Sequence, residues 1–365
     1  MKTLPRNSKQ VISSLLRQEI PDRIGFNESF WPHILENAWL DQGIPKDVDF
    51  TSYFDLDIRP CTWISLPGPC PHLDVTLKED SETLTKRNAW GSITRMWKNK
   101  AGTPEHVGFY LDNPDKWFNE FRKGVIAIQP KDCFDGPNYA KNLALAKEEN
   151  RFSTASSQFI FEWLRLVLGD QYMLESLLTE EEMIHDFNQV FTDKFIEIFD
   201  YAFKTYGKPD GVHIYEDLGY TRSAFASPDC HREMVLPYHK QFFGFFKAQG
   251  LPIIMHTCGD FRVHLDSIYE AGVDCIQALE AKTGMDVADM SEIWKGKMCF
   301  MGNLDIRALE SGDREKMRLE IESKVNRIRA MKAPYIFMSD HSIPPSVTVD
   351  DYKYCVGLYK KLAHY

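Results

Sequence analysis

The stretch LPIIMHTCGD, at residues 251–260, indicates the fold most directly. It begins as an apolar run of strand length and ends in polar residues. The amphipathic segment 261–271 follows it and stops at Gly272. VDCIQALE, at residues 273–280, is then a second short apolar run. A short strand, a helix and another short strand predict a βα repeat and therefore a parallel sheet.

The same alternation extends outward from this stretch over most of the chain. We expect strands at residues 23–27, 152–157, 211–217, 251–260, 273–280, 298–305 and 333–341. We expect helices at residues 8–17, 138–150, 159–168, 180–206, 228–249, 261–271, 313–331 and 349–363. This number of units favours an α/β fold closed into a (β/α)8 TIM barrel, and an open doubly wound sheet is the alternative.

The length of the chain is compatible with one barrel domain. Its 365 residues lie in the usual range for a TIM barrel, so we expect a single domain over residues 1–365. Residues from about 30 to 130 are irregular and rich in Pro, Gly and Trp. Within them we expect a strand at 73–79 and a hairpin at 83–97 with its turn at 88–91. We interpret this region as an N-terminal insertion that packs on the barrel.

Composition excludes several classes of protein. The net charge is −10 and no run of five or more basic residues occurs, which argues against a nucleic-acid partner. No apolar stretch approaches the length of a membrane span, and MKTLPRNSKQ lacks the apolar segment of a signal peptide. The eight cysteines are too widely spread for a disulfide scaffold. We therefore expect a cytoplasmic protein.

Polar residues follow five of the expected strands. They are Glu216-Asp217, His256-Thr257-Cys258-Gly259-Asp260, Glu280, Gly302-Asn303-Leu304-Asp305 and Ser339-Asp340-His341. Any one of them has an equal interpretation as a helix cap or a polar loop residue. Catalytic residues of parallel barrels lie at the carboxyl ends of the strands, so the five together indicate an active site.

A metal site is one interpretation of these strand ends. His256 and Cys258 are two residues apart in an extended segment, so their side chains point to the same side. Imidazole and thiolate are ligands for zinc or cobalt, and His341 and Glu216 could complete the set with a position left open for substrate. The alternative is a hydrogen-bonding histidine beside a small buried cysteine.

Five segments carry a resemblance to a known family. They are SLLRQEIPDRIGF (14–26), SSQFIFEWLRLVLGDQYMLESLLTEEE (156–182), IIMHTCGD (253–260), FMGNLDIRAL (300–309) and SDHSIPPSV (339–347). In these segments the chain resembles the uroporphyrinogen decarboxylase superfamily, which includes cobalamin-dependent methyltransferases. The resemblance implies a TIM barrel.

The HTCG segment is similar to the zinc methyltransferase branch of that superfamily. This similarity implies a Zn²⁺ ion held by His256, Cys258 and a third ligand. The methyltransferases carry a cysteine before the final Pro-Pro, whereas this chain has Asp340-His341 there. His341 can ligate zinc, but the difference puts coenzyme M as the acceptor in doubt.

The decarboxylase branch is less similar. Its members carry an arginine-rich segment near the N-terminus that engages substrate carboxylates. The corresponding stretch GFNESFWPHI, at residues 25–34, contains no arginine. A tetrapyrrole with eight carboxylates needs cationic partners, so the stretch argues against that substrate.

We therefore expect a zinc-dependent methyltransferase. It would move a methyl group between a small methylated substrate, a thiol or another acceptor and the methylcobamide of a separate corrinoid protein. The alternatives are a metal-free decarboxylase of haem biosynthesis and a non-catalytic binding module, and a homodimer is the default assembly. The candidate catalytic residues are Glu216, Asp217, Asp305 and Asp340. The candidate substrate-binding residues are Glu280, Asn303, Tyr53 and Trp31.

Overall fold

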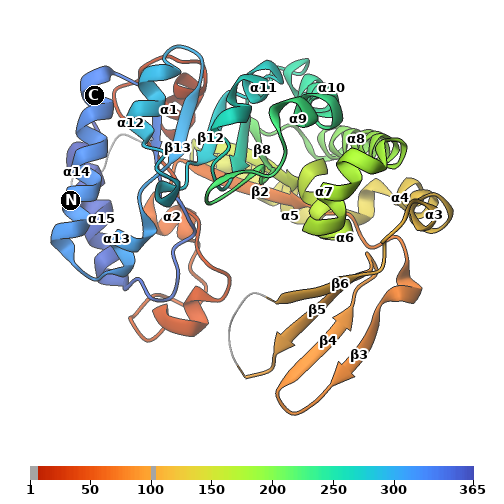
Figure 1. Ribbon diagram of the computed structural model, residues 1–365. Coiled ribbons are helices and arrows are strands. Elements are labelled where there is room, and N and C mark those ends of the chain that lie inside the picture. The colour runs from red at the N-terminus through yellow and green to blue at the C-terminus, as the bar shows by residue number, and fades with distance from the viewer. Residues whose placement is uncertain (1–6, 100–103) are drawn as a thin grey trace.

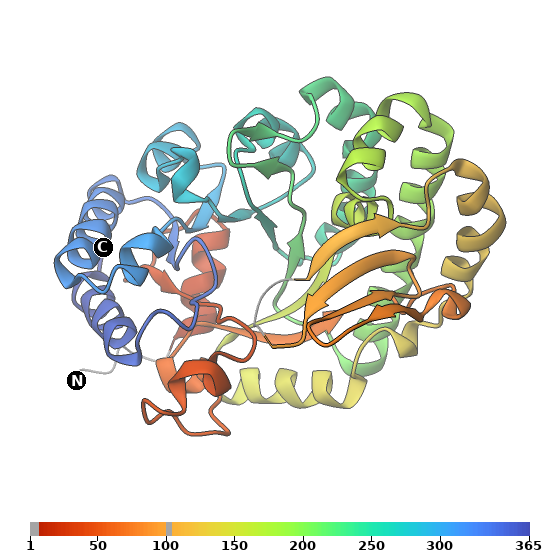
Figure 2. The same cartoon turned by 60° about the horizontal axis from the view of Figure 1, so that its bottom comes forward.

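Eight parallel strands form one curved sheet that helices surround (Figure 1, Figure 2). The computed structural model describes residues 7–99 and 104–365, so the first six residues, which entered the signal-peptide prediction, lie outside the described part. The order across the sheet is β1-β14-β13-β12-β11-β8-β7-β2. The strands are β1 (Gly25–Phe26), β2 (Ile58–Ile64), β7 (Phe152–Gln158), β8 (Gly211–Tyr215), β11 (Ile253–Thr257), β12 (Cys275–Ala278), β13 (Cys299–Gly302) and β14 (Tyr335–Phe337).

The two outer strands of that order, β1 and β2, meet at a seam. The Asp57 N–H donates to the Phe26 carbonyl oxygen at 2.7 Å, and the Phe26 N–H donates to Asp57 Oδ2 at 2.7 Å. Arg23 donates hydrogen bonds from both terminal guanidinium nitrogens to the same carboxylate, at 2.6 and 2.7 Å. The strands therefore follow one another around a closed circuit, and the predicted (β/α)8 TIM barrel is confirmed.

Fifteen α-helices accompany the sheet in the described part of the chain. They are α1 (Ser8–Leu16), α2 (Phe50–Phe54), α3 (Pro114–Lys116), α4 (Arg122–Ala127), α5 (Gly136–Glu148), α6 (Ile160–Leu168), α7 (Asp170–Thr179), α8 (Glu181–Tyr206), α9 (Pro228–Met234), α10 (Leu236–Lys247), α11 (Leu265–Glu270), α12 (Val287–Ile293), α13 (Ile306–Glu310), α14 (Arg314–Met331) and α15 (Val349–Leu362). Short 3-10 or π turns are η1 (Leu35–Trp39), η2 (Pro71–Leu73), η3 (Trp117–Phe121), η4 (Pro130–Asp132), η5 (Arg262–His264) and η6 (Ala281–Thr283).

Helix α1 closes the amino-terminal end of the barrel. Its Val11, Ile12 and Leu15 are buried in one cluster with residues from β2, β7, β11, β12, β13 and β14. Cys275 and Cys299 belong to that cluster and are fully buried. Because this end is filled with apolar side chains, chemistry is confined to the opposite end, where the strands finish.

Helices α7, α12 and α13 lie where no element was expected, and two further differences concern the barrel itself. Strand β2 lies inside the region from 30 to 130 that we expected to be irregular; Pro60 and a register shift beside it break its pattern. The single helix expected at 228–249 is divided into α9 and α10, because Pro237 supplies no N–H for a continuous helix. The barrel therefore recruits one strand from a segment whose local pattern does not predict it.

A four-stranded antiparallel sheet stands beside the barrel (Figure 1). Its strands are β3 (Val75–Glu79), β4 (Thr83–Arg87), β5 (Ser92–Trp97) and β6 (Glu105–Phe109). The hairpin expected at 83–97 is confirmed by the pairing of β4 with β5. A further ribbon, β9 (Gly219–Tyr220) and β10 (Ser223–Ala224), follows β8.

This antiparallel sheet is fixed to the barrel by aromatic packing. The ring centroids of Trp90 and Trp163 lie 4.7 Å apart. Phe109 covers Gly169, where an added Cβ would come within 2.2 Å of the ring and where φ is +77°. Only glycine tolerates both that contact and that backbone conformation, so the residue between α6 and α7 is adapted to the neighbouring sheet.

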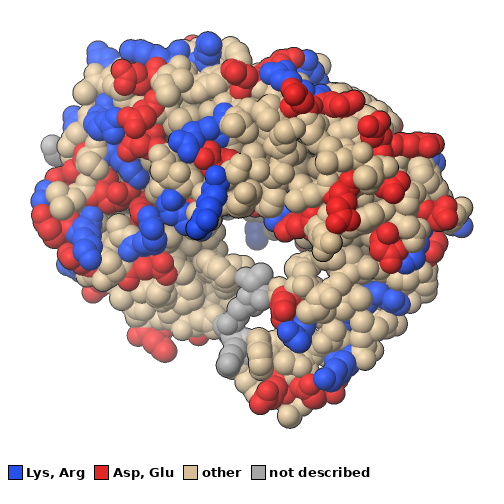
Figure 3. Space-filling model, in the orientation of Figure 1, with Lys and Arg blue, Asp and Glu red and all other residues tan. Residues whose placement is uncertain are grey.

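The surface carries a mixture of charges. Figure 3 shows acidic and basic side chains interspersed over one face, which is hollowed beside the antiparallel sheet. Such mixing is typical of a solvated surface. Among the described residues, no helix has the length and apolar character needed to cross a membrane.

The seam between β1 and β2 gives a stability prediction. We expect Asp57→Ala to lower the free energy of unfolding by about 3–5 kcal/mol, because it leaves Arg23 buried and unpaired. Arg23 and Asp57 are 3% and 1% exposed. Urea unfolding followed by circular dichroism measures the change. Glu19→Ala, which breaks an exposed pair with Arg17, is the control, and an equal loss in both variants would contradict the role of the seam.

Candidate active site

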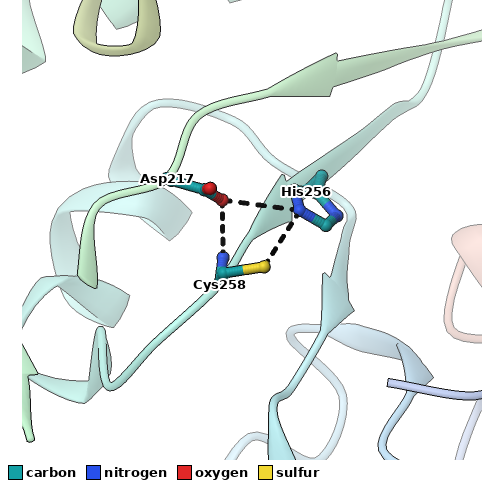
Figure 4. Close-up of side chains that lie close together, drawn as sticks. All are labelled: Asp217, His256 and Cys258. Atoms are coloured by element: carbon teal, nitrogen blue, oxygen red, sulfur yellow. Dashed lines mark hydrogen bonds and ion pairs between the residues drawn. The ribbon is translucent and has the colours of Figure 1, made fainter. Parts of the chain in front are cut away.

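Three ligand-type side chains converge where β8 and β11 end (Figure 4). His256 Nε2 lies 3.3 Å from Cys258 Sγ and 3.4 Å from Asp217 Oδ1. The three ligand atoms all lie within 4.8 Å of one another. The sequence-based pairing of His256 with Cys258 on one side is therefore present in the structure, and Asp217 joins them from the neighbouring strand.

Backbone and side-chain hydrogen bonds hold this group in place. Asp217 Oδ1 accepts the Cys258 N–H at 2.8 Å. His256 Nδ1 is hydrogen-bonded to Gln277 Oε1, and the register of β11 and β12 places these two residues side by side. An amide oxygen only accepts, so Nδ1 carries the proton and Nε2 points at the other two side chains.

A glycine allows the chain to turn directly after this group. Gly259 has φ +72°, and an added Cβ would lie 2.1 Å from the Gly219 carbonyl carbon. The backbones after β8 and β11 therefore touch, which no residue with a side chain permits. This contact brings the segment of Asp217 against the segment of Cys258.

The ionisation of the three groups is coupled. Burial acts to lower the pKa of His256, but Cys258 and Asp217 outweigh it and raise that pKa well above its usual value. Burial also acts to raise the pKa of Asp217, yet the hydrogen bond and charge of His256 lower it to about 2. Burial raises the pKa of the Cys258 thiol, and His256 opposes this increase. One positive charge on His256 thus balances the carboxylate.

The geometry fits a tetrahedral metal ion. Ligands at about 2.0–2.3 Å from a zinc ion are separated from one another by about 3.3–3.8 Å. The two separations from His256 Nε2, 3.3 Å to Cys258 Sγ and 3.4 Å to Asp217 Oδ1, lie in that range. Three ligands from the protein and one open position are typical of catalytic zinc sites. Zinc-bound histidines commonly donate their other ring N–H to an oxygen acceptor, as His256 Nδ1 does to Gln277 Oε1.

His341 lies apart from this group and faces Glu280. Its Nε2 is 3.6 Å from Glu280 Oε1, and its Nδ1 is 3.1 Å from Asp340 Oδ1. The hydrogen bond with Asp340 raises the pKa of His341. Glu280 Oε2 accepts the Gly259 N–H at 2.9 Å, so Glu280 stands between the HTCG segment and His341. A ligand role for His341 stays a prediction.

Glu216 is held on the helix side of the sheet. Its carboxylate accepts the N–H groups of Phe161 and Glu162 at the start of α6, at 3.2 and 3.0 Å. His239 Nε2 lies 2.7 Å from Glu216 Oε1. Successive strand residues alternate in direction, and Glu216 is consequently bonded away from the group of three.

The remaining candidates at strand ends have structural contacts. Asp340 accepts the N–H groups of Ala281 and Ile306, at 2.9 and 3.0 Å. Asp305 caps α13 and pairs with Arg307 at 2.6 Å. Asn303 accepts the Val287 N–H at 2.8 Å and donates to two carbonyls. These residues order the loops around the barrel mouth.

The two aromatic candidates lie in separate surface depressions. Trp31 lines one of about 420 Å³ with Glu28 and Pro60, and Tyr53 lines another between α2 and α15. The aromatic rings beside His256 are different ones. Tyr215 stacks on His256 at 4.6 Å between centroids, and Trp63 contacts Tyr215 at 4.9 Å.

Sequence reasoning missed four residues near this end of the barrel. Gln277 orients His256 from mid-strand, where no polar-end signal exists. Arg165 pairs with Glu162 at 2.7 Å and lies 3.8 Å from Asp217 Oδ2. Burial, followed by the charge of Asp217, raises the pKa of Glu162 to about 7.

Glu28 is the fourth residue that the sequence analysis did not single out, although its position after a strand could have identified it. It directly follows the strand expected at 23–27, as the other polar residues follow theirs. Ser339 Oγ donates to its Oε1 at 2.6 Å. Burial raises the pKa of Glu28 to about 8.

The chain matches one protein-family model and is similar to a solved methyltransferase. The family model "Uroporphyrinogen decarboxylase (URO-D)" matches residues 169–362, more than half of the chain. A solved methyltransferase from Methanosarcina mazei is 11% identical, with a TM-score of 0.64, and the match covers 97% of this chain and 98% of that one. This likeness shows the shared fold.

A second solved structure is much less similar to this chain. A Xaa-Pro dipeptidase with bound methionine in the active site is 12% identical over 61% of this chain and 63% of its own, with a TM-score of 0.28 that carries no argument. No curated protein matches the chain.

Two buried histidines behind Glu216 give a pH prediction. Burial lowers the pKa of His231 to about 2 and that of His264 to about 4. The unfolded chain binds their protons at about pH 6.5. Their stabilisation is therefore complete above that pH and is lost as the pH falls, at about 1.4 kcal/mol per pH unit for each histidine.

The measurement is the slope of unfolding free energy between pH 6 and 4.5. The raised pKa of Glu28 changes this slope in the opposite direction. The slope of each variant is therefore compared with the slope of the unaltered protein, in which Glu28 contributes equally. We expect His231→Phe to flatten the slope by about 1.4 kcal/mol per pH unit. His72→Phe, at an exposed histidine, is expected to leave it unchanged; equal slopes in all three proteins would contradict the prediction.

Proposed function

The chain belongs to the uroporphyrinogen decarboxylase family, and from this premise we propose that it is a zinc-dependent methyltransferase. It moves a methyl group between a small methylated substrate or a thiol acceptor and the corrinoid of a separate protein. One observation carries the proposal: Asp217, His256 and Cys258 present oxygen, nitrogen and sulfur within 4.8 Å at the carboxyl ends of neighbouring strands.

The proposed zinc ligands are therefore Asp217, His256 and Cys258, with His341 as the alternative third ligand. Zn²⁺ bound there supplies Lewis acidity, which lowers the pKa of a thiol acceptor or polarises a methyl donor. Binding of the metal would displace the Nε2 proton of His256 and the thiol proton of Cys258, while the Nδ1 proton stays on its bond to Gln277. A thiolate ligand also suits zinc better than it suits Mg²⁺ or Ca²⁺.

The surrounding residues position these ligands and the substrate. Gln277 keeps the proton of His256 on Nδ1 and so directs Nε2 to the site. Arg165 lies against the outer oxygen of Asp217 and limits its rotation. Tyr215 and the 45% exposed Trp63 form an aromatic wall that leads from His256 to solvent. Such a wall suits the apolar part of a methylated substrate.

A corrinoid partner is part of the proposal. The described residues form the barrel and the antiparallel sheet beside it, and none of these elements is an additional cobalamin-binding domain. We propose that another protein delivers the cobalt at the barrel mouth.

Metal content tests the ligand set. We expect about one zinc per chain in protein purified without a metal-binding tag, measured by inductively coupled plasma mass spectrometry. Asp217→Ala, His256→Ala and Cys258→Ala should each lose most of it, because each removes one of three ligands. His341→Ala should retain it.

The same measurement separates the two ligand sets. Loss of zinc in His341→Ala with retention in Asp217→Ala would replace Asp217 by His341 as the third ligand. Zinc near zero in the unaltered protein after growth and dialysis with added zinc would contradict the proposal as a whole.

Methyl transfer tests the activity. With free methylcobalamin and a small thiol as surrogate substrates, we expect zinc-dependent demethylation of the corrinoid, followed by its visible absorbance. Gln277→Leu should reduce the rate by about 10–100-fold, because the orientation of His256 is lost. Gln129→Leu, at an exposed glutamine, is the matched control. Decarboxylation of uroporphyrinogen without metal would instead support the metal-free alternative.

A further inference from the structure

A groove of about 600 Å³ lies on the outer wall of the barrel, between α2 and α15. Its floor and sides include Tyr53, Phe54, Val356 and Gly357, and three lysines line it from α15. Helix α2 has five residues and α15 has fourteen. The short helix after β1 therefore leaves the carboxyl-terminal half of α15 without a full-length neighbour at the seam.

Gly357 opens the floor of this groove. It lies in the interior of α15, where glycine costs about 1 kcal/mol relative to alanine. A Cβ added there would meet nothing within 4 Å, so no close packing requires the glycine. The missing side chain instead leaves open space at the helix backbone, and Gly357 lines the groove together with Val356 and Tyr53.

The lysines of the groove are not neutralised by carboxylates. Among residues 7–99 and 104–365, Lys353, Lys360 and Lys361 form no ion pair, whereas Lys247, Lys282 and Lys324 each pair with an acidic group. Lys353 Nζ lies 5.6 Å from the centroid of the Tyr53 ring. Three unpaired cations on a chain of net charge −10 form a local positive site that suits an anion.

The shape of the groove selects an elongated ligand. Its α15 residues recur at spacings of three and four, which places them on one face of the helix. From Lys353 to Lys361 this face extends about 12 Å along the helix axis. The volume of the groove lies in the range of small-molecule sites.

We propose that this groove binds a long-chain carboxylate. The acyl chain lies along Val356 and Gly357, under Tyr53, and the carboxylate is bound by Lys360 and Lys361. The apolar floor excludes simple inorganic anions as the best ligands, and the lysines exclude neutral and cationic chains. The site is separate from Asp217, His256 and Cys258 and needs no metal.

Calorimetric titration of the full chain with decanoate, below its micelle concentration, tests the proposal. We expect saturable binding of one decanoate per chain. Acetate, which has the same head group, and decyltrimethylammonium, which has the same chain length, should each bind at least about tenfold more weakly. Equal binding of decyltrimethylammonium would overturn the proposal, because the lysines would then have no part in recognition.

Two sets of variants locate the site. Gly357→Leu fills the floor of the groove and should weaken decanoate binding at least about tenfold. Thermal unfolding checks that this variant still folds. Gly357→Ala should raise the stability of α15. Lys360→Gln with Lys361→Gln should weaken binding and reduce its dependence on salt. Lys131→Gln with Lys141→Gln, two exposed lysines elsewhere, is the matched control.

The remaining outcomes oppose the proposal. Unchanged decanoate affinity in folded Gly357→Leu would overturn it. A dimer in gel filtration that dissociates in Gly357→Leu would also overturn it, since the groove would then be covered by a second copy of the chain.

Discussion

The bidentate contact of Arg23 with Asp57 is the interaction on which the rest of the structure depends. It joins β1 to β2, the two strands that stand at opposite ends of the sheet order. The carboxylate also accepts the Phe26 N–H, and Tyr359 from the last helix donates to the Ile24 carbonyl oxygen beside it. Because both charges are buried, neither has water as an alternative partner, and the seam has one favourable arrangement.

Closure of the barrel has a direct consequence for the active site. The amino-terminal end is filled by α1, so polar groups can gather only at the end where the strands finish. There, neighbouring strands bring Asp217 to within 3.4 Å of His256. The contact of Gly219 with Gly259 and the bond from Gln277 fix the positions of these side chains before any ligand arrives. Such preorganisation is what a catalytic metal site requires.

The same barrel offers a second, unrelated environment on its outside. The helix layer is incomplete next to the seam, because α2 is short and α15 is long. At the mouth, carboxylates accept backbone N–H groups and lie against histidines. In the outer groove, by contrast, the lysines have apolar neighbours and form no ion pair with any described residue. The two places therefore suit different chemistry, group transfer at the mouth and binding of an amphipathic anion at the wall.

The sequence by itself determined the repeat of strands and helices, the (β/α)8 class and the presence of polar residues at strand ends. It also determined that His256 and Cys258 point the same way, since this depends only on the two-residue period of an extended chain. The direction of these two side chains is a local feature of a few consecutive residues, whereas the (β/α)8 class follows from the number of units along most of the chain.

Only the tertiary structure decided which of the strand ends meet. Strand β2 was hidden by Pro60, and the third member of the group could be identified as Asp217 only because β8 lies next to β11. Glu216, one residue earlier, is turned to the helices, and Tyr53 lies in the outer groove. The physical reason is that proximity across a closed sheet depends on strand order and register, which contacts distant in the sequence establish together.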